Sequence, residues 1–134
     1  MIEYIQYNAK YFDSVQDLIL DTITQLNSAD YDADMIKIMQ DWQSGERLTK
    51  KFSEGVYYLA VKNSNVIGVG GLVGTEICTM FVNPLYNGKG IGRKILYLLI
   101  KEARKKKLTK ISLSSTLTAR KIVIKNATNA KMYL

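Results

Sequence analysis

Histidine is absent from the 134 residues of this sequence, and cysteine and proline each occur only once. Without histidine, the chain cannot form a Ser-His-Asp triad or a histidine-ligated zinc site. The single cysteine, Cys78, can form neither an internal disulfide nor a thiolate zinc site, so we expect a buried thiol in a reducing compartment. Any catalysis must therefore use carboxylates, hydroxyls, amines or the backbone, and we expect no metal.

Long hydrophobic runs are also missing. No apolar stretch approaches the roughly 20 residues that a membrane-spanning helix needs, and the first residues lack the order of a signal peptide. The composition is 47% hydrophobic and 23% charged, which is typical of an ordinary globular protein. We therefore expect a single domain over residues 1–134, located in the cytoplasm and without a membrane partner.

Acidic residues are scarce in one part of the chain. Residues 87–110 contain nine Lys or Arg against one acidic residue, whereas residues 1–86 contain six against eleven. The net charge of +7 thus comes from a basic segment that follows an acidic first half. A small nucleic-acid binder is one alternative, but no evident aromatic stacking platform accompanies the basic run at 104–107, so we expect no nucleic-acid partner.

Hydrophobic periodicity predicts a mixed α/β protein. The predicted strands are residues 2–8, 56–63, 66–73, 75–83 and 110–115. The predicted helices are residues 13–27, a shorter one around 35–42, and one that follows a glycine-rich turn and ends at 104–107. Three consecutive strands imply antiparallel pairing, and the final strand, helix and strand imply one parallel crossover.

Local signals refine this outline. Asp13 or Ser14 is expected to cap the first helix, and residues 44–55 are interpreted as a connection with some helical turn. Three glycines weaken the strand at 66–73 by propensity, so they predict a β-bulge or close backbone packing there. They are Gly68, Gly70 and Gly71.

The most informative stretch is NPLYNGKGIGRKIL, at residues 83–96. Its three glycines lie between a strand and a helix, so the first amides of that helix lack intrahelical partners and can bind an anion. These glycines are Gly88, Gly90 and Gly92, and the adjacent cations are Lys89, Arg93 and Lys94. The spacing matches neither the dinucleotide fingerprint nor a P-loop. We predict a seat for phosphate or pyrophosphate; the alternative is a turn that merely lets the helix start close to the sheet.

This stretch resembles motif A of the GNAT superfamily of acetyltransferases, written Gln/Arg-x-x-Gly-x-Gly/Ala after a strand that ends in V-x-P. Gly90 and Gly92 match the two small positions, while Asn87 stands where glutamine or arginine is usual. The resemblance implies a mostly antiparallel sheet flanked by helices. It extends to about Lys121, and the tail beyond predicts incomplete or altered C-terminal strands.

The resemblance implies an N-acetyltransferase that moves an acetyl group from acetyl-coenzyme A to a primary amine by direct attack, without a metal. Its implied coenzyme A contacts are Met80, Val82, Asn87, Gly88, Lys89, Gly90, Ile91, Gly92, Arg93 and Thr116. A backbone N–H near Phe81 is implied to polarise the thioester carbonyl. For Met80, Phe81 and Val82, the alternative is an ordinary strand core.

The reaction also needs a base, because deprotonating an alkylammonium with a pKa near 10.4 at neutral pH costs roughly 4 to 5 kcal/mol. Glu76 opens the central strand, where the family often places a catalytic glutamate; the alternative is a solvated strand end. The tyrosine that often serves the family as an acid is missing, since Ile122 and Val123 occupy the expected Phe-Tyr places.

The acceptor is the least determined part of the function. Asp30, Asp32 and Asp34 lie in the interhelix loop that borders the acceptor site in this family, and the acidic first half would attract a cation. We therefore expect a small-molecule or peptide amine with positive charge, although each aspartate alone is more simply a solvated or capping residue. The alternative function is a catalytically weak or inactive acyl-coenzyme A binding protein of the same fold. An incomplete sheet edge would also favour a homodimer.

Overall fold

The computed structural model describes residues 1–24, 37, 45–109 and 111–113. Five strands form one sheet in the order β1-β2-β3-β4-β5. They are β1 (Glu3–Gln6), β2 (Val56–Lys62), β3 (Asn65–Val73), β4 (Glu76–Val82) and β5 (Ser112–Leu113). The first four pair antiparallel and β5 pairs parallel to β4. The predicted mixed, mostly antiparallel sheet is confirmed.

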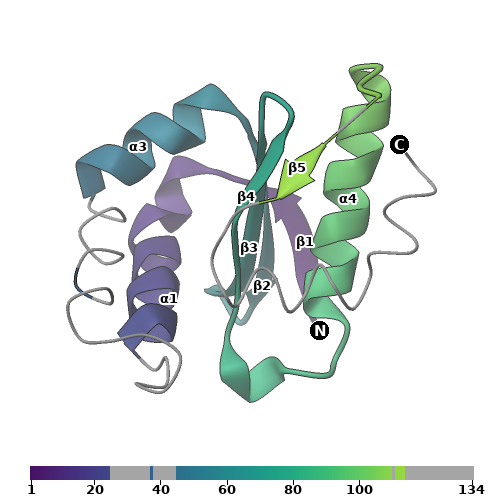
Figure 1. Cartoon of the computed structure of the whole chain (residues 1–134). Coiled ribbons are helices and arrows are strands. Elements are labelled where there is room, and N and C mark those ends of the chain that lie inside the picture. The colour runs from purple at the N-terminus through teal and green to yellow at the C-terminus, as the bar shows by residue number, and fades with distance from the viewer. Residues whose placement is uncertain (25–36, 38–44, 110, 114–134) are drawn as a thin grey trace.

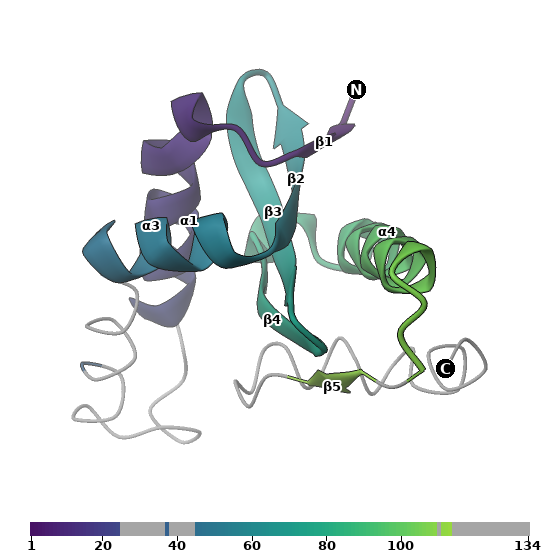
Figure 2. The ribbon, with the colours of Figure 1, turned by 90° about the horizontal axis from the view of Figure 1, so that it is seen from above.

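Helices cover both faces of this sheet (Figures 1 and 2). Helices α1 (Phe12–Thr24) and α3 (Gly45–Glu54) lie on one face, and α4 (Ile91–Lys105) lies on the other. Two short 3-10 turns, η1 (Ala9–Tyr11) and η2 (Pro84–Tyr86), precede α1 and α4. Among the described residues, no helix is long and apolar enough to cross a membrane. Apart from residue 37, the helix predicted around 35–42 lies outside the described residues, as do the aspartates at 30, 32 and 34.

The two faces of the sheet have separate apolar cores, because successive side chains of a strand point to opposite sides. One core joins the sheet to α4 and includes Met80, Val82 and Ile95. The other joins it to α1 and α3 and includes Phe81 and Ile19. Burying each such side chain contributes roughly 1.5 to 3 kcal/mol, so both layers of helix are held mainly by apolar packing.

The segment interpreted from sequence as a connection, residues 44–55, is instead largely helix α3, ten residues long. Its buried apolar residues are Leu48 and Phe52, one turn apart. The Phe52 ring packs against the rings of Tyr7 and Tyr57, at centroid distances of 4.3 and 4.7 Å. Two apolar positions are a weak periodic signal, so the prediction missed a helix that is stabilised by tertiary packing.

The predicted cap of α1 is wrong, because Asp13 and Ser14 both lie inside a helix that begins at Phe12. Ser14 Oγ instead accepts a hydrogen bond of 3.0 Å from the backbone N–H of Val66 in β3. The capping residue stands earlier, at Asn8, whose side chain accepts from the N–H of Lys10 at the start of η1. Ser14 therefore links α1 to the sheet through this hydrogen bond and does not cap the helix.

The bulge and the close backbone packing predicted from the glycines of β3 are both confirmed. A Cβ at Gly68 or Gly70 would lie 2.8 or 2.7 Å from side-chain atoms of Ile91 or Ile95, so α4 packs directly on bare backbone. The pairing of β3 with β4 also shifts between Val69 and Gly71, which leaves Gly70 opposite two residues of β4. The bulged residues of β4 are Thr79 and Met80.

Candidate functional site

The glycine turn presents backbone amides at the start of α4. Gly90 precedes the helix with φ of 80°, and Gly88 has φ of 81°, a region that side chains other than glycine rarely adopt. No side chain caps the helix, and the N–H of Lys94 bonds to the carbonyl of Gly90 at 3.0 Å. The amides of residues 91 and 92 precede that bond, and the first amides of an α-helix have no acceptor within the helix.

The space around the turn favours a ligand over simple helix packing. A Cβ added at Gly88 or Gly90 would meet no atom within 4 Å, in contrast to one at Gly68 or Gly70. Gly88 and Gly90 are therefore not required by packing against the sheet. The buried Ile91 packs there instead, beside Gly68 of β3. What glycine provides at 88 and 90 is the left-handed backbone and open access to the amides.

Positive charge surrounds these amides. Lys89, Arg93 and Lys94 are exposed beside the turn, and the first turn of α4 contains no acidic residue. The ammonium of Lys89 lies 5.8 Å from the centre of the Tyr86 ring, and that of Lys62 lies 5.3 Å from the same ring. Because the helix dipole adds its positive end here, the site suits a phosphate or pyrophosphate.

Strand β4 leads into this turn, and its side chains belong to the core. Met80, Phe81 and Val82 are at most 7% exposed, so only their backbone is available to a ligand. The N–H of Asn83 bonds to the carbonyl of Ile67 in β3 at 2.8 Å. Since amides alternate in direction along a strand, that of Val82 points away from β3. The amide role near Phe81 stays a prediction, and this alternation favours its neighbour Val82.

A buried polar cluster lies behind the bulge, and the sequence analysis missed it. Thr79 has φ of 54°, is buried, and its Oγ1 makes no hydrogen bond within the described part of the chain. The Tyr57 hydroxyl lies 3.4 Å from Cys78 Sγ, which confirms the buried thiol. Burial, and then the neighbouring Cys78, raise the pKa of Tyr57 far above its ordinary value. In the sequence, only the neighbouring glycines of β3 indicated that the backbone is irregular at this place.

Glu76 lies away from the glycine turn. It is exposed at the start of β4, where it pairs with Val73 of β3 and Ser112 of β5. Val82 is six positions further along the strand, or about 20 Å away at 3.3 Å per position. An extended ligand along β4 would have to connect the two, so the role of Glu76 as a base stays a prediction. Thr116 lies outside the described residues.

A pocket of about 390 Å³ lies on the α1 face of the sheet, near the end of β4. The polar residues of its lining come from three segments: Ser14, Asp17, Asp21 and Thr22 of α1, Asn65 at the start of β3, and Asn83 after β4. The carboxyl-terminal end of α1 and the β4–α4 connection lie at the same end of the molecule, at the bottom of Figure 1. The sequence did not predict this pocket, although Ser14, Asp17 and Asp21 have the spacing of one helix face.

Comparison with protein families places most of the chain in one family. Residues 15–125 match the model of the Acetyltransferase (GNAT) family. The chain belongs to the GNAT acetyltransferase family. The GNAT resemblance inferred from motif A is confirmed, and the matched range contains the glycine turn and all of β4.

Solved structures agree with this GNAT fold. A GCN5-related N-acetyltransferase from Rhodopseudomonas palustris aligns with TM-score 0.82 and 18% identity, over 92% of this chain and 79% of that one. The PaiA N-acetyltransferase of Thermoplasma acidophilum, solved with coenzyme A, aligns with TM-score 0.79 and 16% identity, over 96% and 88%. A predicted acetyltransferase from Clostridium acetobutylicum, solved with acetyl-coenzyme A, aligns with TM-score 0.65 and 19% identity, over 93% and 88%. A search of curated proteins returns no match.

Proposed function

We propose that this GNAT protein is an N-acetyltransferase that transfers the acetyl group of acetyl-coenzyme A to a primary amine of a cationic acceptor. The observation that carries the proposal is the glycine turn, where Gly88 and Gly90 have open surroundings just before the start of α4 and three cations lie beside them. Membership of the GNAT family supports the acyltransferase class. The coenzyme A and acetyl-coenzyme A bound in two similar structures support the choice of donor.

In this proposal the turn holds the pyrophosphate of the donor. Its oxygens would accept hydrogen bonds from the amides at the start of α4, with the exposed Lys89, Arg93 and Lys94 as countercharges. The pantetheine arm would follow the backbone of β4, whose buried side chains leave only amides and carbonyls to bind it. The amide near Phe81 would then donate to the thioester oxygen as negative charge develops there.

The remaining chemistry is proton transfer. The acceptor amine must lose a proton to attack the carbonyl, and Glu76 is our candidate base, either directly or through water. The nitrogen–carbon bond forms as the carbon–sulfur bond breaks, and the departing thiolate takes up a proton from solvent or from a residue. With an ordinary thiol pKa near 8.5, that last step gains only about 2 kcal/mol from an acid at neutral pH.

The second candidate function is a non-catalytic acyl-coenzyme A binding protein of the same fold. This function is favoured by the apolar Ile122 and Val123, because they occupy the positions where the family often has a Phe-Tyr pair whose tyrosine acts as the acid. Steady-state release of thiol with a panel of amines, compared with a coenzyme A titration, separates the two. Binding without any release above the uncatalysed rate supports the second function.

The decisive test of the donor site is calorimetric titration of acetyl-coenzyme A into the wild-type protein and Gly90→Glu. The glutamate would put a side chain and a negative charge in the proposed phosphate seat, so we expect affinity to fall at least tenfold. Gly74→Glu is the matched control, because Gly74 also has positive φ, of 60°, and open surroundings, but lies in the β3–β4 turn.

Both variants should lose similar thermal stability, since each forces a side chain into the left-handed region, at a cost of order 1 to 3 kcal/mol. Only Gly90→Glu should lose the ligand. Equal affinities for the two variants, or wild-type affinity in Gly90→Glu, would show that the turn does not hold the donor.

A further inference from the structure

The outer side of α4 carries charge of one sign. Lys94, Lys101 and Lys105 are exposed at spacings of seven and four residues, so they lie along one side of the helix. The only acidic residue of α4, Glu102, is 9% exposed, and its carboxylate accepts a hydrogen bond from the Tyr58 hydroxyl of β2. Among the described helices, only α4 lies on this face of the sheet (Figure 2). Its outer side thus presents lysines to solvent with no exposed carboxylate between them.

Tyrosine rings alternate with these lysines. The ammonium of Lys94 lies 5.9 Å from the centre of the Tyr4 ring and 5.7 Å from that of Tyr97. The ammonium of Lys101 lies 5.6 Å from the centre of the Tyr97 ring. Tyr97 is 46% exposed and is the one large exposed hydrophobic side chain of α4. An aromatic platform, not evident in the sequence beside residues 104–107, therefore stands about two turns earlier on the helix.

The same pattern continues to the glycine turn. The Tyr86 ring has the ammonium of Lys89 at 5.8 Å, and Tyr86 packs against the core on the α4 side of the sheet, as Tyr4 does. Aromatic and basic side chains thus follow one another from the turn along α4. We call them the tyrosine–lysine strip: Tyr4, Tyr86, Lys89, Lys94, Tyr97 and Lys101.

This combination suits nucleotides better than other anions. A nucleotide joins a flat base to a phosphate, so a ring beside an ammonium can bind both parts, and bases stack on aromatic side chains regardless of sequence. A membrane-surface helix needs a free apolar side, whereas α4 packs its apolar side against the sheet. An acidic protein would use the charges without needing the rings.

We propose that the tyrosine–lysine strip is a docking site for single-stranded nucleic acid, with bases stacked on Tyr97 and its neighbours and phosphates paired with Lys94 and Lys101. The site extends beyond the glycine turn and does not depend on the proposed acetyl transfer. Coenzyme A has a single base, whereas three rings follow one another along the strip.

The experiment is a fluorescence anisotropy titration of wild type and variants with a labelled oligothymidylate of about 12 nucleotides. An abasic oligomer of the same length keeps the phosphates without the bases, and polyglutamate represents an acidic protein. Tyr97→Ala should bind oligothymidylate at least about fivefold more weakly and bind the abasic oligomer as wild type does. Tyr97→Phe keeps the ring and is the matched control, so it should retain wild-type affinity for oligothymidylate.

The phosphate contacts are tested by salt dependence. Lys101→Gln should reduce the slope of log affinity against log salt concentration by about 0.7, the value for one contact to a single strand. Lys10→Gln is the control, because it also removes an exposed ammonium, 5.1 Å from the centre of the Tyr11 ring, but on the α1 side of the sheet. Its slope should equal that of wild type.

Unchanged oligothymidylate affinity in Tyr97→Ala, or equal affinity of wild type for the two oligomers, overturns the inference. Polyglutamate bound as tightly as oligothymidylate also overturns it, in favour of an acidic protein partner. Tyr97→Ala should keep the wild-type affinity for coenzyme A; a parallel loss of both ligands would place Tyr97 in the donor site instead. Wild type that binds oligothymidylate but no coenzyme A contradicts the proposed function alone, and the reverse contradicts this inference alone.

Discussion

Glycines serve different purposes at different positions of this chain, and what a side chain there would meet separates them. At Gly88 and Gly90 a Cβ meets open space and the backbone has positive φ, so glycine supplies conformation and access. At Gly71 a Cβ would overlap the ring of Tyr57, so glycine there makes room for an aromatic side chain. That ring carries the hydroxyl that reaches Cys78 beside the bulge.

Gly71→Ala should destabilise the protein by about 1 to 3 kcal/mol, because the added methyl group must displace the Tyr57 ring within a packed core. Urea denaturation of the variant measures this loss. Repeating the substitution in a Tyr57→Val background provides the control, since valine has no ring to overlap. There the cost should fall below about 1 kcal/mol. An equal cost in both backgrounds would mean that the strain lies in the backbone of β3.

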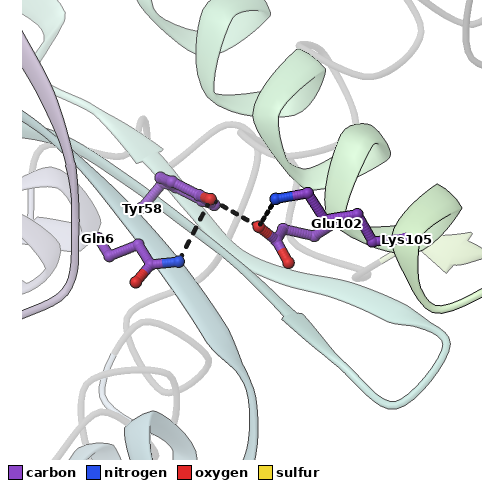
Figure 3. A network of polar contacts seen from close by, with 4 residues as sticks. All are labelled: Gln6, Tyr58, Glu102 and Lys105. Carbon is purple, nitrogen blue, oxygen red and sulfur yellow. Dashed lines mark hydrogen bonds and ion pairs between the residues drawn. The ribbon is translucent and has the colours of Figure 1, made fainter.

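At the scale of elements, a polar network fixes the far end of α4 to the sheet. The Tyr58 hydroxyl of β2 donates to Glu102 Oε1 at 2.8 Å, and Lys105 Nζ lies 3.5 Å from the same oxygen (Figure 3). Gln6 of β1 donates to the Tyr58 hydroxyl at 3.4 Å. Glu102 lies eleven residues after the start of α4, about 16 Å along the helix from the glycine turn. The network therefore orients α4 without contacting the candidate site.

Tyr58→Phe should lower the free energy of unfolding by about 1 kcal/mol, because it removes the hydrogen bond to a largely buried carboxylate. Acetyl-coenzyme A affinity should stay within about twofold of wild type. A double-mutant cycle with Glu102→Gln, measured by urea denaturation, isolates the coupling between the two side chains. Strictly additive losses would show that the Tyr58 hydroxyl and Glu102 do not stabilise the protein through their mutual hydrogen bond.

Helices and strands were predictable from the sequence where the apolar pattern repeats over many residues. They were not predictable where only a few residues hold the segment in its conformation. The hairpin of β2 and β3, the strand β4 ended by Pro84, and α4 after the glycine turn were all predicted, because each has a repeated apolar pattern or a strong terminator. Helix α3 was missed because only Leu48 and Phe52 hold it to the core.

Site residues followed the same division. The glycine turn was predictable because its chemistry is local: three glycines and three cations within seven residues. The bulge at Thr79 and the pocket of Asp17 and Asn83 depend on strand register and on contacts between distant segments. No single stretch of sequence contains that information.

At the scale of the whole molecule, the uneven charge along the sequence becomes a division between the two faces of the sheet. The acidic first half supplies α1 and its pocket, and the basic segment supplies α4 and the glycine turn on the opposite face. An anionic donor and a cationic acceptor would thus be attracted to different faces of one end of the sheet. This separation gives the proposed acetyl transfer an electrostatic basis.

The folded protein should also lose stability at alkaline pH, because burial raises the pKa of several tyrosines, namely Tyr4, Tyr7, Tyr57 and Tyr58. A raised pKa means that the folded state favours the neutral phenol. Its contribution to stability is therefore complete below the ordinary tyrosine pKa near 10 and is lost as pH rises through the higher folded value. Urea denaturation at pH values from about 8 to about 11 should show a steadily falling free energy of unfolding above about pH 10.

Tyr57→Phe tests which group dominates this loss. The variant should be less stable at neutral pH, since the contact of the hydroxyl with Cys78 is gone, but its stability should fall less steeply above about pH 10. Tyr97→Phe is the control, because the Tyr97 ring is 46% exposed on α4 and its removal should leave the slope unchanged. Wild-type steepness in Tyr57→Phe would assign the alkaline loss to the other tyrosines or to the lysines, whose ordinary pKa lies nearby.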